Sequence, residues 1–260
     1  MKGTGLIVLL LGLACSCGQG GSRQGALTPV SDLDVECMGT NRLPLECLSL
    51  TRDEGELTLR YQFHAEDCLC TSYPVLVCPD RGRWTVTVNG MAMTPLKGKP
   101  DAAEERYNID AVVHEGENTV ELHGTGSVVP VSLTGDFSVR PMQPSGWSLS
   151  SGSKLGLGSL SLQGLPFYQG TVSYRREYEA AEKVGKRILR LSGWKGGSCE
   201  LWVNEEKVAD VTTDLFEMNI GPFFREGLNG VEIRITRPGQ APDRCSVPAE
   251  FGLFQDFTIE

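Results

Sequence analysis

The chain has 260 residues, 40% of them hydrophobic and 22% charged, which suits one large or two small folded domains and excludes a disordered or fibrous protein. Its 24 basic and 33 acidic residues give a formal net charge of −9, and the basic residues are scattered, which argues against a nucleic-acid partner. A (β/α)₈ barrel takes about 250 residues, so the chain has no room for a barrel together with anything else.

The N-terminus has the features of an export signal. A charged start at Met1 and Lys2 precedes an apolar run over 6–14 that is too short to span a bilayer, and Cys15 and Cys17 follow directly. This order resembles a bacterial lipoprotein signal. The resemblance implies cleavage before one of the two cysteines and lipidation of that cysteine, with Cys17 slightly favoured over Cys15. An ordinary secretory signal is the alternative.

We therefore expect a signal peptide over 1–16 and a flexible tether over 17–27, where Gly, Ser and Gln are frequent. The mature protein would be exported, as an outer-membrane or periplasmic lipoprotein that contacts the membrane only through its lipid anchor. Export would also permit disulfide bonds.

Of the nine cysteines, an odd number follow the signal, so at least one is expected to be unpaired or to pair outside the chain: Cys37, Cys47, Cys68, Cys70, Cys78, Cys199 and Cys245. We expect disulfides among the first five, with a Cys199–Cys245 bridge as an open option. A zinc site at Cys68, Cys70 and Cys78 is the weaker alternative, because the second C-x-x-C pair of a structural zinc site is missing.

Short segments of alternating apolar and polar residues dominate the rest of the chain, and helical periodicity is almost absent. They predict half-buried strands separated by Gly or Pro, at 57–63, 84–88, 120–122, 131–133, 137–139, 172–174, 189–191, 201–203 and 231–235. This spacing predicts an all-β protein built from β-sandwiches.

A weak internal repeat indicates two tandem sandwiches. A strand ends at Asn89 and a Gly-x-Asn turn follows at Asn118; later, a strand ends at Asn204 and Gly-x-Asn follows at Asn229. Val-Asn-Gly is a type I′ hairpin signal, because Asn and Gly both tolerate positive φ. We expect a first sandwich over 28–140, a linker over 141–164 and a second sandwich over 165–260.

Four segments of the second half carry motifs in a characteristic order, at 165–175, 189–196, 203–204 and 227–229. They resemble the galactose-binding-like jelly-roll domain of large glycoside hydrolases, especially the C-terminal region of bacterial α-L-rhamnosidases and the sugar-binding domain of family 2 β-galactosidase relatives. The resemblance covers roughly residues 55–260 and implies a jelly-roll second sandwich. It departs from the family pattern at Glu205, which stands where the hairpin glycine is expected.

The catalytic barrel that lies upstream in those enzymes has no counterpart in this sequence, where the signal leads straight into the sandwiches. We therefore expect no catalytic residues, and the chain carries no nucleophile elbow, His-rich metal motif or phosphate loop. No cofactor or metal is expected, although a structural calcium ion is left open because sandwich domains of this kind often hold one.

Aromatic residues near loops are the candidate ligand-binding groups. Trp147 lies amid Gly and Ser, Tyr168 precedes a strand, and Trp194 and Lys195 lie in a glycine-rich turn. Because sugars stack their C–H faces on aromatic rings while their hydroxyls form hydrogen bonds, these four residues predict a carbohydrate platform at a sandwich rim. The alternative for Tyr168 and Trp194 is core packing. Trp202 is expected on an outer face or at an interdomain contact.

These features predict a non-catalytic carbohydrate-binding or accessory lipoprotein associated with glycan degradation, with an oligosaccharide or polysaccharide as its partner. Two alternatives stay open. One is a structural or protein-interaction lipoprotein with an envelope protein partner. The other is a sandwich-only portion of a split glycoside hydrolase.

Overall fold

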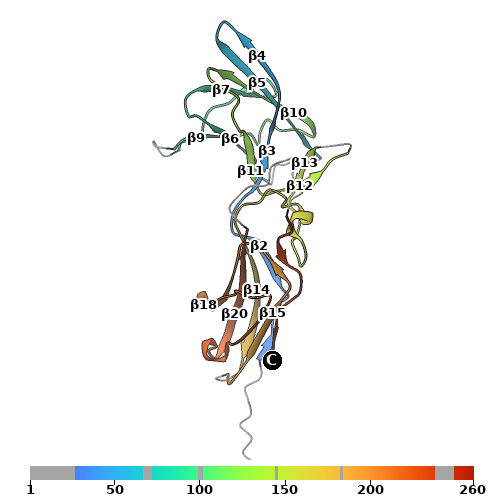
Figure 1. Cartoon of the computed structure of the whole chain (residues 1–260), viewed down its shortest axis with the longest axis vertical. Helices are drawn as coiled ribbons and strands as arrows, with labels where there is room; N and C mark the ends of the chain where they lie inside the picture. Colours follow the sequence, from blue (N-terminus) through green and yellow to red (C-terminus); the bar gives the residue numbers. More distant parts are fainter. Residues whose placement is uncertain (1–26, 67–71, 99–101, 144–145, 182–183, 238–248) are drawn as a thin grey trace, which may run out of the picture.

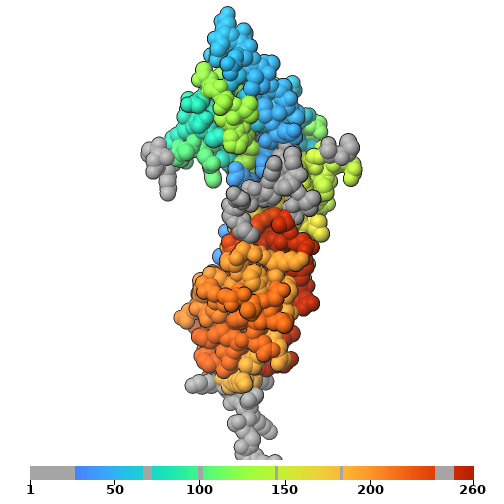
Figure 2. Space-filling model, viewed as in Figure 1, coloured from blue at the N-terminus to red at the C-terminus, as the bar shows by residue number. Residues whose placement is uncertain are grey.

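The computed structural model describes residues 27–66, 72–98, 102–143, 146–181, 184–237 and 249–260. These residues form strands and two short 3₁₀ turns, η1 (Leu160–Gln163) and η2 (Gly221–Phe223), which confirms the predicted all-β class. Figures 1 and 2 show two lobes arranged along the long axis. No helix in the described part of the chain is long and apolar enough to cross a membrane.

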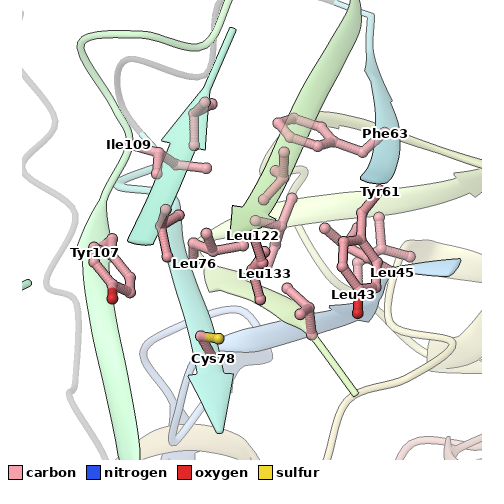
Figure 3. Close-up of a cluster of buried hydrophobic side chains, with 14 of the residues drawn as sticks. Leu43, Leu45, Tyr61, Phe63, Leu76, Cys78, Tyr107, Ile109, Leu122 and Leu133 are labelled. Carbon is pink, nitrogen blue, oxygen red and sulfur yellow. The ribbon is translucent and has the colours of Figure 1, made fainter. Parts of the chain in front are cut away.

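The first lobe is built from two facing sheets. Its strands are β3 (Asn41–Pro44), β4 (Glu46–Asp53), β5 (Glu56–Ala65), β6 (Val75–Pro79), β7 (Trp84–Val88), β8 (Met91–Ala92), β9 (Glu104–Asn108), β10 (Gly116–Gly124), β11 (Ser132–Gly135), β12 (Phe137–Pro141) and β13 (Trp147–Ser151). The seven-stranded sheet has the order β12-β13-β5-β10-β7-β8 with β4 also paired to β5, and the four-stranded sheet has the order β3-β11-β6-β9. Side chains of both sheets, including Tyr61, Leu122 and Leu133, form one buried core (Figure 3).

The second lobe has a six-stranded sheet opposite smaller sheets. Its strands are β1 (Leu27–Pro29), β2 (Asp34–Cys37), β14 (Thr171–Ala180), β15 (Ile188–Ser192), β16 (Trp194–Lys195), β17 (Ser198–Val203), β18 (Glu206–Asp210), β19 (Leu215–Asn219), β20 (Gly227–Thr236), β21 (Gly252–Leu253) and β22 (Thr258–Ile259). The large sheet has the order β1-β14-β20-β17-β18 with β2 also paired to β14, and the smaller sheets are β19-β15-β22 and β16-β21.

The alternation read in the sequence explains how the large sheet of the second lobe buries one face. On β20, Val231, Ile233 and Ile235 are fully buried, while the residues between them are half-exposed. Full burial of one such side chain contributes about 1.5–3 kcal/mol. Because β20 pairs with β14 along ten residues, these strands form the centre of the second core.

Two segments pair differently from the predicted division of the chain. Strands β1 and β2, expected at the end of the tether and in the first sandwich, instead pair with β14 of the second lobe. They cover the edge of β14 opposite β20, which would otherwise expose a long row of unpaired backbone groups. Strand β13, expected within the linker, pairs with β12 and β5 in the first lobe.

Two consecutive aromatic residues join the lobes. Phe167 belongs to the first core and packs edge-on against Trp147, with ring centres 4.9 Å apart. Tyr168 belongs to the second core and stacks on Phe251, at 6.2 Å and 17°. Asn41 strengthens this junction, because its Nδ2 donates to the carbonyls of Phe137 and Gly164 at 2.8 and 2.7 Å. The lobes are therefore connected by packed side chains as well as by the chain itself.

The predicted internal repeat is present as a hydrogen-bonded pair of asparagines in each lobe, here called the Asn clasp. In the first lobe, Asn89 Nδ2 donates to Asn118 Oδ1 and to the Val112 carbonyl, both at 2.8 Å, while Asn89 Oδ1 accepts from the Thr119 amide at 2.9 Å. Asn118 is fully buried, and Asn89 has a φ of 52°, as the hairpin signal requires.

The second lobe repeats this geometry. Asn204 Nδ2 donates to Asn229 Oδ1 at 2.9 Å and to the Phe223 carbonyl at 3.1 Å, and Asn204 Oδ1 accepts from the Gly230 amide at 3.1 Å. Asn204 has a φ of 53° and Glu205 a φ of 68°, so Glu205 takes the left-handed conformation expected of a glycine. The repeat is confirmed, including the departure at Glu205.

The described cysteines are free thiols: Cys37, Cys47, Cys78 and Cys199. The expectation of disulfides is therefore wrong for these four. Cys78 belongs to the first core and Cys199 to the second. Burial raises the pKa of the Cys199 thiol to about 12. The remaining predicted partners, Cys68, Cys70 and Cys245, lie outside the described residues, as does the candidate lipidation site at Cys15 or Cys17.

Candidate functional site

A depression of about 400 Å³ on the second lobe brings together an aromatic ring and several charged groups. It is called the Trp194 pocket, and its walls are formed by Trp194, Lys195, Gly196, Asp214, Arg237, Ala249, Glu250 and Phe251. The β16–β21 pair forms one side of it, with Trp194 opposite Leu253. The Phe251 carbonyl also accepts from the amide of Leu160 in η1, so the pocket lies at the end of the lobe nearest the junction.

Two glycines allow the chain to present Trp194 and Lys195. Gly193 has a φ of 66°, which turns the backbone between β15 and β16 at little cost for glycine. At Gly196, a Cβ atom would lie 2.6 Å from the Cγ2 atom of Ile235. Only a residue without a side chain therefore lets β16 run this close to β20.

The Trp194 ring is partly exposed and partly packed against the second core. Its Nε1 donates to the Thr213 carbonyl at 3.3 Å, which ties β16 to the turn before β19. Leu215, the first residue of β19, is 81% exposed. An apolar surface with a fixed ring is thus available beside the polar groups of the pocket.

Both cationic side chains of the pocket, Lys195 and Arg237, already interact with other residues of the protein. Lys195 forms an ion pair with Glu250 and lies 5.0 Å from the centre of the Phe254 ring. Arg237 is 6% exposed, and its Nη1 donates to the carbonyls of Leu165 and Pro166 at 3.0 and 2.7 Å. Desolvation lowers the pKa of the Arg237 guanidinium from its ordinary value. Arg237 thereby anchors the segment before Phe167 to the second lobe.

The four residues predicted to bind ligand do not all meet. Trp194 and Lys195 line one pocket. Tyr168 is fully buried and its hydroxyl donates to the Thr171 carbonyl at 2.7 Å; it supports the pocket from behind, through its stacking on Phe251. Trp147 lies on β13, packed against the first core. The sequence placed all four near loops, but packing separates them.

Sequence reasoning missed five residues that line the pocket: Asp214, Arg237, Ala249, Glu250 and Phe251. Asp214 lies in a Thr-Thr-Asp turn, and Glu250 precedes the closing segment 251–254. Neither carries a local signal, because only the pairing of β16 with β21 brings the closing segment beside Trp194.

The carboxylates of the pocket are arranged to accept hydrogen bonds. Glu250 is exposed and paired with Lys195, and Asp214 is exposed with no hydrogen-bond or ion-pair partner among the residues described. Across the described part of the chain, no group of three or more His, Cys, Asp or Glu side chains could hold a metal ion.

No protein-family model matches the sequence, and no curated protein matches it. Solved structures that resemble parts of the chain include an α-L-rhamnosidase of Streptomyces avermitilis, at 14% identity over 80% of this chain and 24% of that chain, with a TM-score of 0.28. A β-glucuronidase of Bacteroides uniformis matches at 12% identity over 80% and 28%, with a TM-score of 0.27.

A β-D-glucuronidase of Dictyoglomus thermophilum matches at 13% identity over 84% of this chain and 39% of that chain, with a TM-score of 0.27. The chain therefore spans less than half the length of these enzymes. Such low TM-scores establish neither a shared fold nor a shared activity. The chain is an all-β protein whose partial structural neighbours are glycoside hydrolases.

Proposed function

We propose that the protein is a non-catalytic carbohydrate-binding module that holds a glycan at the Trp194 pocket, as an accessory to glycan degradation. The observation that carries this proposal is the partly exposed Trp194 ring in the wall of a depression that also contains Lys195, Asp214 and Glu250. A sugar offers C–H groups to such a ring and hydroxyls to such carboxylates.

The size and fixation of the pocket support the same proposal. Its volume of about 400 Å³ is within the range of about 300–1,000 Å³ common to small-molecule sites. Trp194 is held by core packing and by its bond to Thr213, so little conformational freedom is lost when a sugar stacks on it.

The proposed function includes attachment to the cell envelope through a lipid on Cys17 or Cys15. The described part of the chain begins with β1 at Leu27. Figure 1 shows the C-terminus at the end of the second lobe that faces away from the first lobe. A chain anchored by its N-terminus would carry the first lobe outermost. Labelling with radioactive palmitate tests the anchor: label that persists in Cys15→Ser and disappears in Cys17→Ser assigns it to Cys17, and label in neither variant nor the parent protein contradicts lipidation.

The binding test compares two tryptophans of the same lobe. We expect Trp194→Ala to weaken glycan binding at least tenfold, measured by affinity electrophoresis on polysaccharide gels and by calorimetry with oligosaccharides. Trp202→Ala is the matched control, because Trp202 is also half-buried but lies on the outer face of β17, beneath the Arg234 guanidinium at 3.8 Å. Thermal unfolding verifies that each variant is folded.

Three results would contradict the proposal. If the folded parent protein binds no glycan, the proposed carbohydrate-binding function is excluded. Hydrolysis of aryl-rhamnosides or aryl-galactosides by the purified chain favours the split-hydrolase alternative. Recovery of a stoichiometric envelope partner, combined with glycan binding that Trp194→Ala leaves unchanged, favours a protein-interaction role.

A further inference from the structure

Among the residues that the structure describes, the Trp194 pocket offers no unpaired cation to an acidic ligand. Lys195 already pairs with Glu250, and Arg237 is nearly buried and donates to carbonyls of 165–168. A ligand carboxylate would have to displace Glu250 from Lys195, or draw Arg237 away from the backbone that it anchors. Either exchange replaces one charged hydrogen bond with another and gains little binding free energy.

Asp214 adds to the same wall a negative charge that pairs with no cation of the described residues. Its backbone is fixed on both sides, because the Thr213 carbonyl accepts from Trp194 Nε1 at 3.3 Å and the Thr213 hydroxyl donates to the Leu215 carbonyl at 2.8 Å. The Asp214 carboxylate itself has no partner within the described ranges. Asp214 therefore lies in the same wall as Trp194, and no described residue occupies its carboxylate oxygens.

From these charges we propose that the Trp194 pocket selects neutral sugars over uronates, and that Asp214 determines this selectivity. The inference rests on the carbohydrate-binding function proposed above. A carboxylate accepts charge-assisted hydrogen bonds from two neighbouring hydroxyls of a neutral sugar. The same carboxylate repels the carboxylate of a uronate, and at contact distance in a partly exposed pocket this repulsion amounts to about a tenfold loss of affinity or more.

The test uses a panel of neutral gluco-, galacto-, manno- and rhamno-oligosaccharides beside glucuronate, galacturonate and mannuronate oligomers of equal length. We expect the parent protein to bind at least one neutral oligomer and to bind uronates at least tenfold more weakly. Asp214→Asn keeps the size of the side chain and removes its charge, so uronate binding should rise at least threefold while binding of the neutral oligomer changes less than threefold.

Glu205→Gln is the matched control. Glu205 is exposed in the β17–β18 turn of the same lobe, outside the Trp194 pocket, and its substitution changes the net charge equally. It should leave the ratio of neutral to uronate binding unchanged, which separates the local effect of Asp214 from the net charge of −9.

The outcomes distinguish the two levels of the proposal. If the folded protein binds no oligomer of the panel, the binding function fails and the selectivity with it. If it binds neutral and uronate oligomers equally, or if Asp214→Asn leaves their ratio unchanged, the selectivity inference is overturned while the binding function stands.

Discussion

The Asn clasp of the second lobe supports a quantitative prediction for Asn229→Ala. Asn229 is fully buried and makes four hydrogen bonds through its side chain. Nδ2 donates to the carbonyls of Arg225 and Gly227 at 2.8 Å, and Oδ1 accepts from the Arg225 amide and from Asn204 Nδ2 at 2.9 Å. Each such bond contributes about 1 kcal/mol net, so the substitution should lower the free energy of unfolding by about 3–4 kcal/mol.

This loss should lower Tm by about 10 °C or more, since about 2–4 °C is lost per kcal/mol in a domain of 150–250 residues and more in a smaller one. Urea denaturation and calorimetry measure both quantities. Asn118→Ala in the first lobe should cost a similar amount, because Asn118 makes the equivalent bonds to His114, Gly116 and Asn89. Asn108→Ala is the control, since Asn108 is exposed and accepts one bond, from the Asp110 amide.

A loss below about 1 kcal/mol for both clasp variants would refute the reasoning. It would mean that water satisfies the released carbonyl and amide groups, and that the clasp repeats in both lobes for a reason other than stability. A large loss in Asn108→Ala would equally show that the measured effect is not specific to buried asparagines.

Three further predictions concern Phe167, Gly196 and Cys199. Phe167→Ala should lower the free energy of unfolding by about 3–5 kcal/mol and separate the melting of the two lobes in calorimetry, whereas a single unshifted transition would show that Phe167 does not couple them. Gly196→Ala should cost about 1–3 kcal/mol, because its Cβ would meet Ile235, and unchanged stability by urea denaturation would contradict the close approach. The Cys199 thiol, whose pKa burial raises to about 12, should resist maleimide labelling at pH 8 until urea unfolds the chain. Because its folded pKa exceeds the unfolded value of 9.0, Cys199 contributes stability that is complete below about pH 9 and is lost as the pH rises towards 12. A free energy of unfolding that does not change over this range would contradict the raised pKa of Cys199.

Local signals account for the parts of the fold that were predictable. The Asn clasp was visible at Asn89 and Asn204 because a hairpin with positive φ restricts the residues that can occupy it. Trp194 and Lys195 were found because glycines flank them, and glycines mark the turns where side chains reach the surface.

The errors arise where distant segments meet. Strand β1 was assigned to the tether and the first sandwich because nothing in Leu27–Pro29 specifies a partner as remote as Ala180. For Tyr168 the sequence left ligand binding and core packing both open, and it is buried because it stacks on Phe251, which arrives from the C-terminal end. Asp214 was missed for the same reason, since its significance depends on the tertiary position of Trp194.

The pairing of β1 and β2 with β14 makes the first lobe an insertion within the second. During synthesis from the N-terminus, β1 and β2 emerge before their partner strand β14 exists, so they can pair only after the whole first lobe has been made. The first lobe can fold on local contacts in that interval, whereas the second lobe closes only when its last strands arrive. This order of pairing gives the two lobes an order of assembly, with the Trp194 pocket completed last.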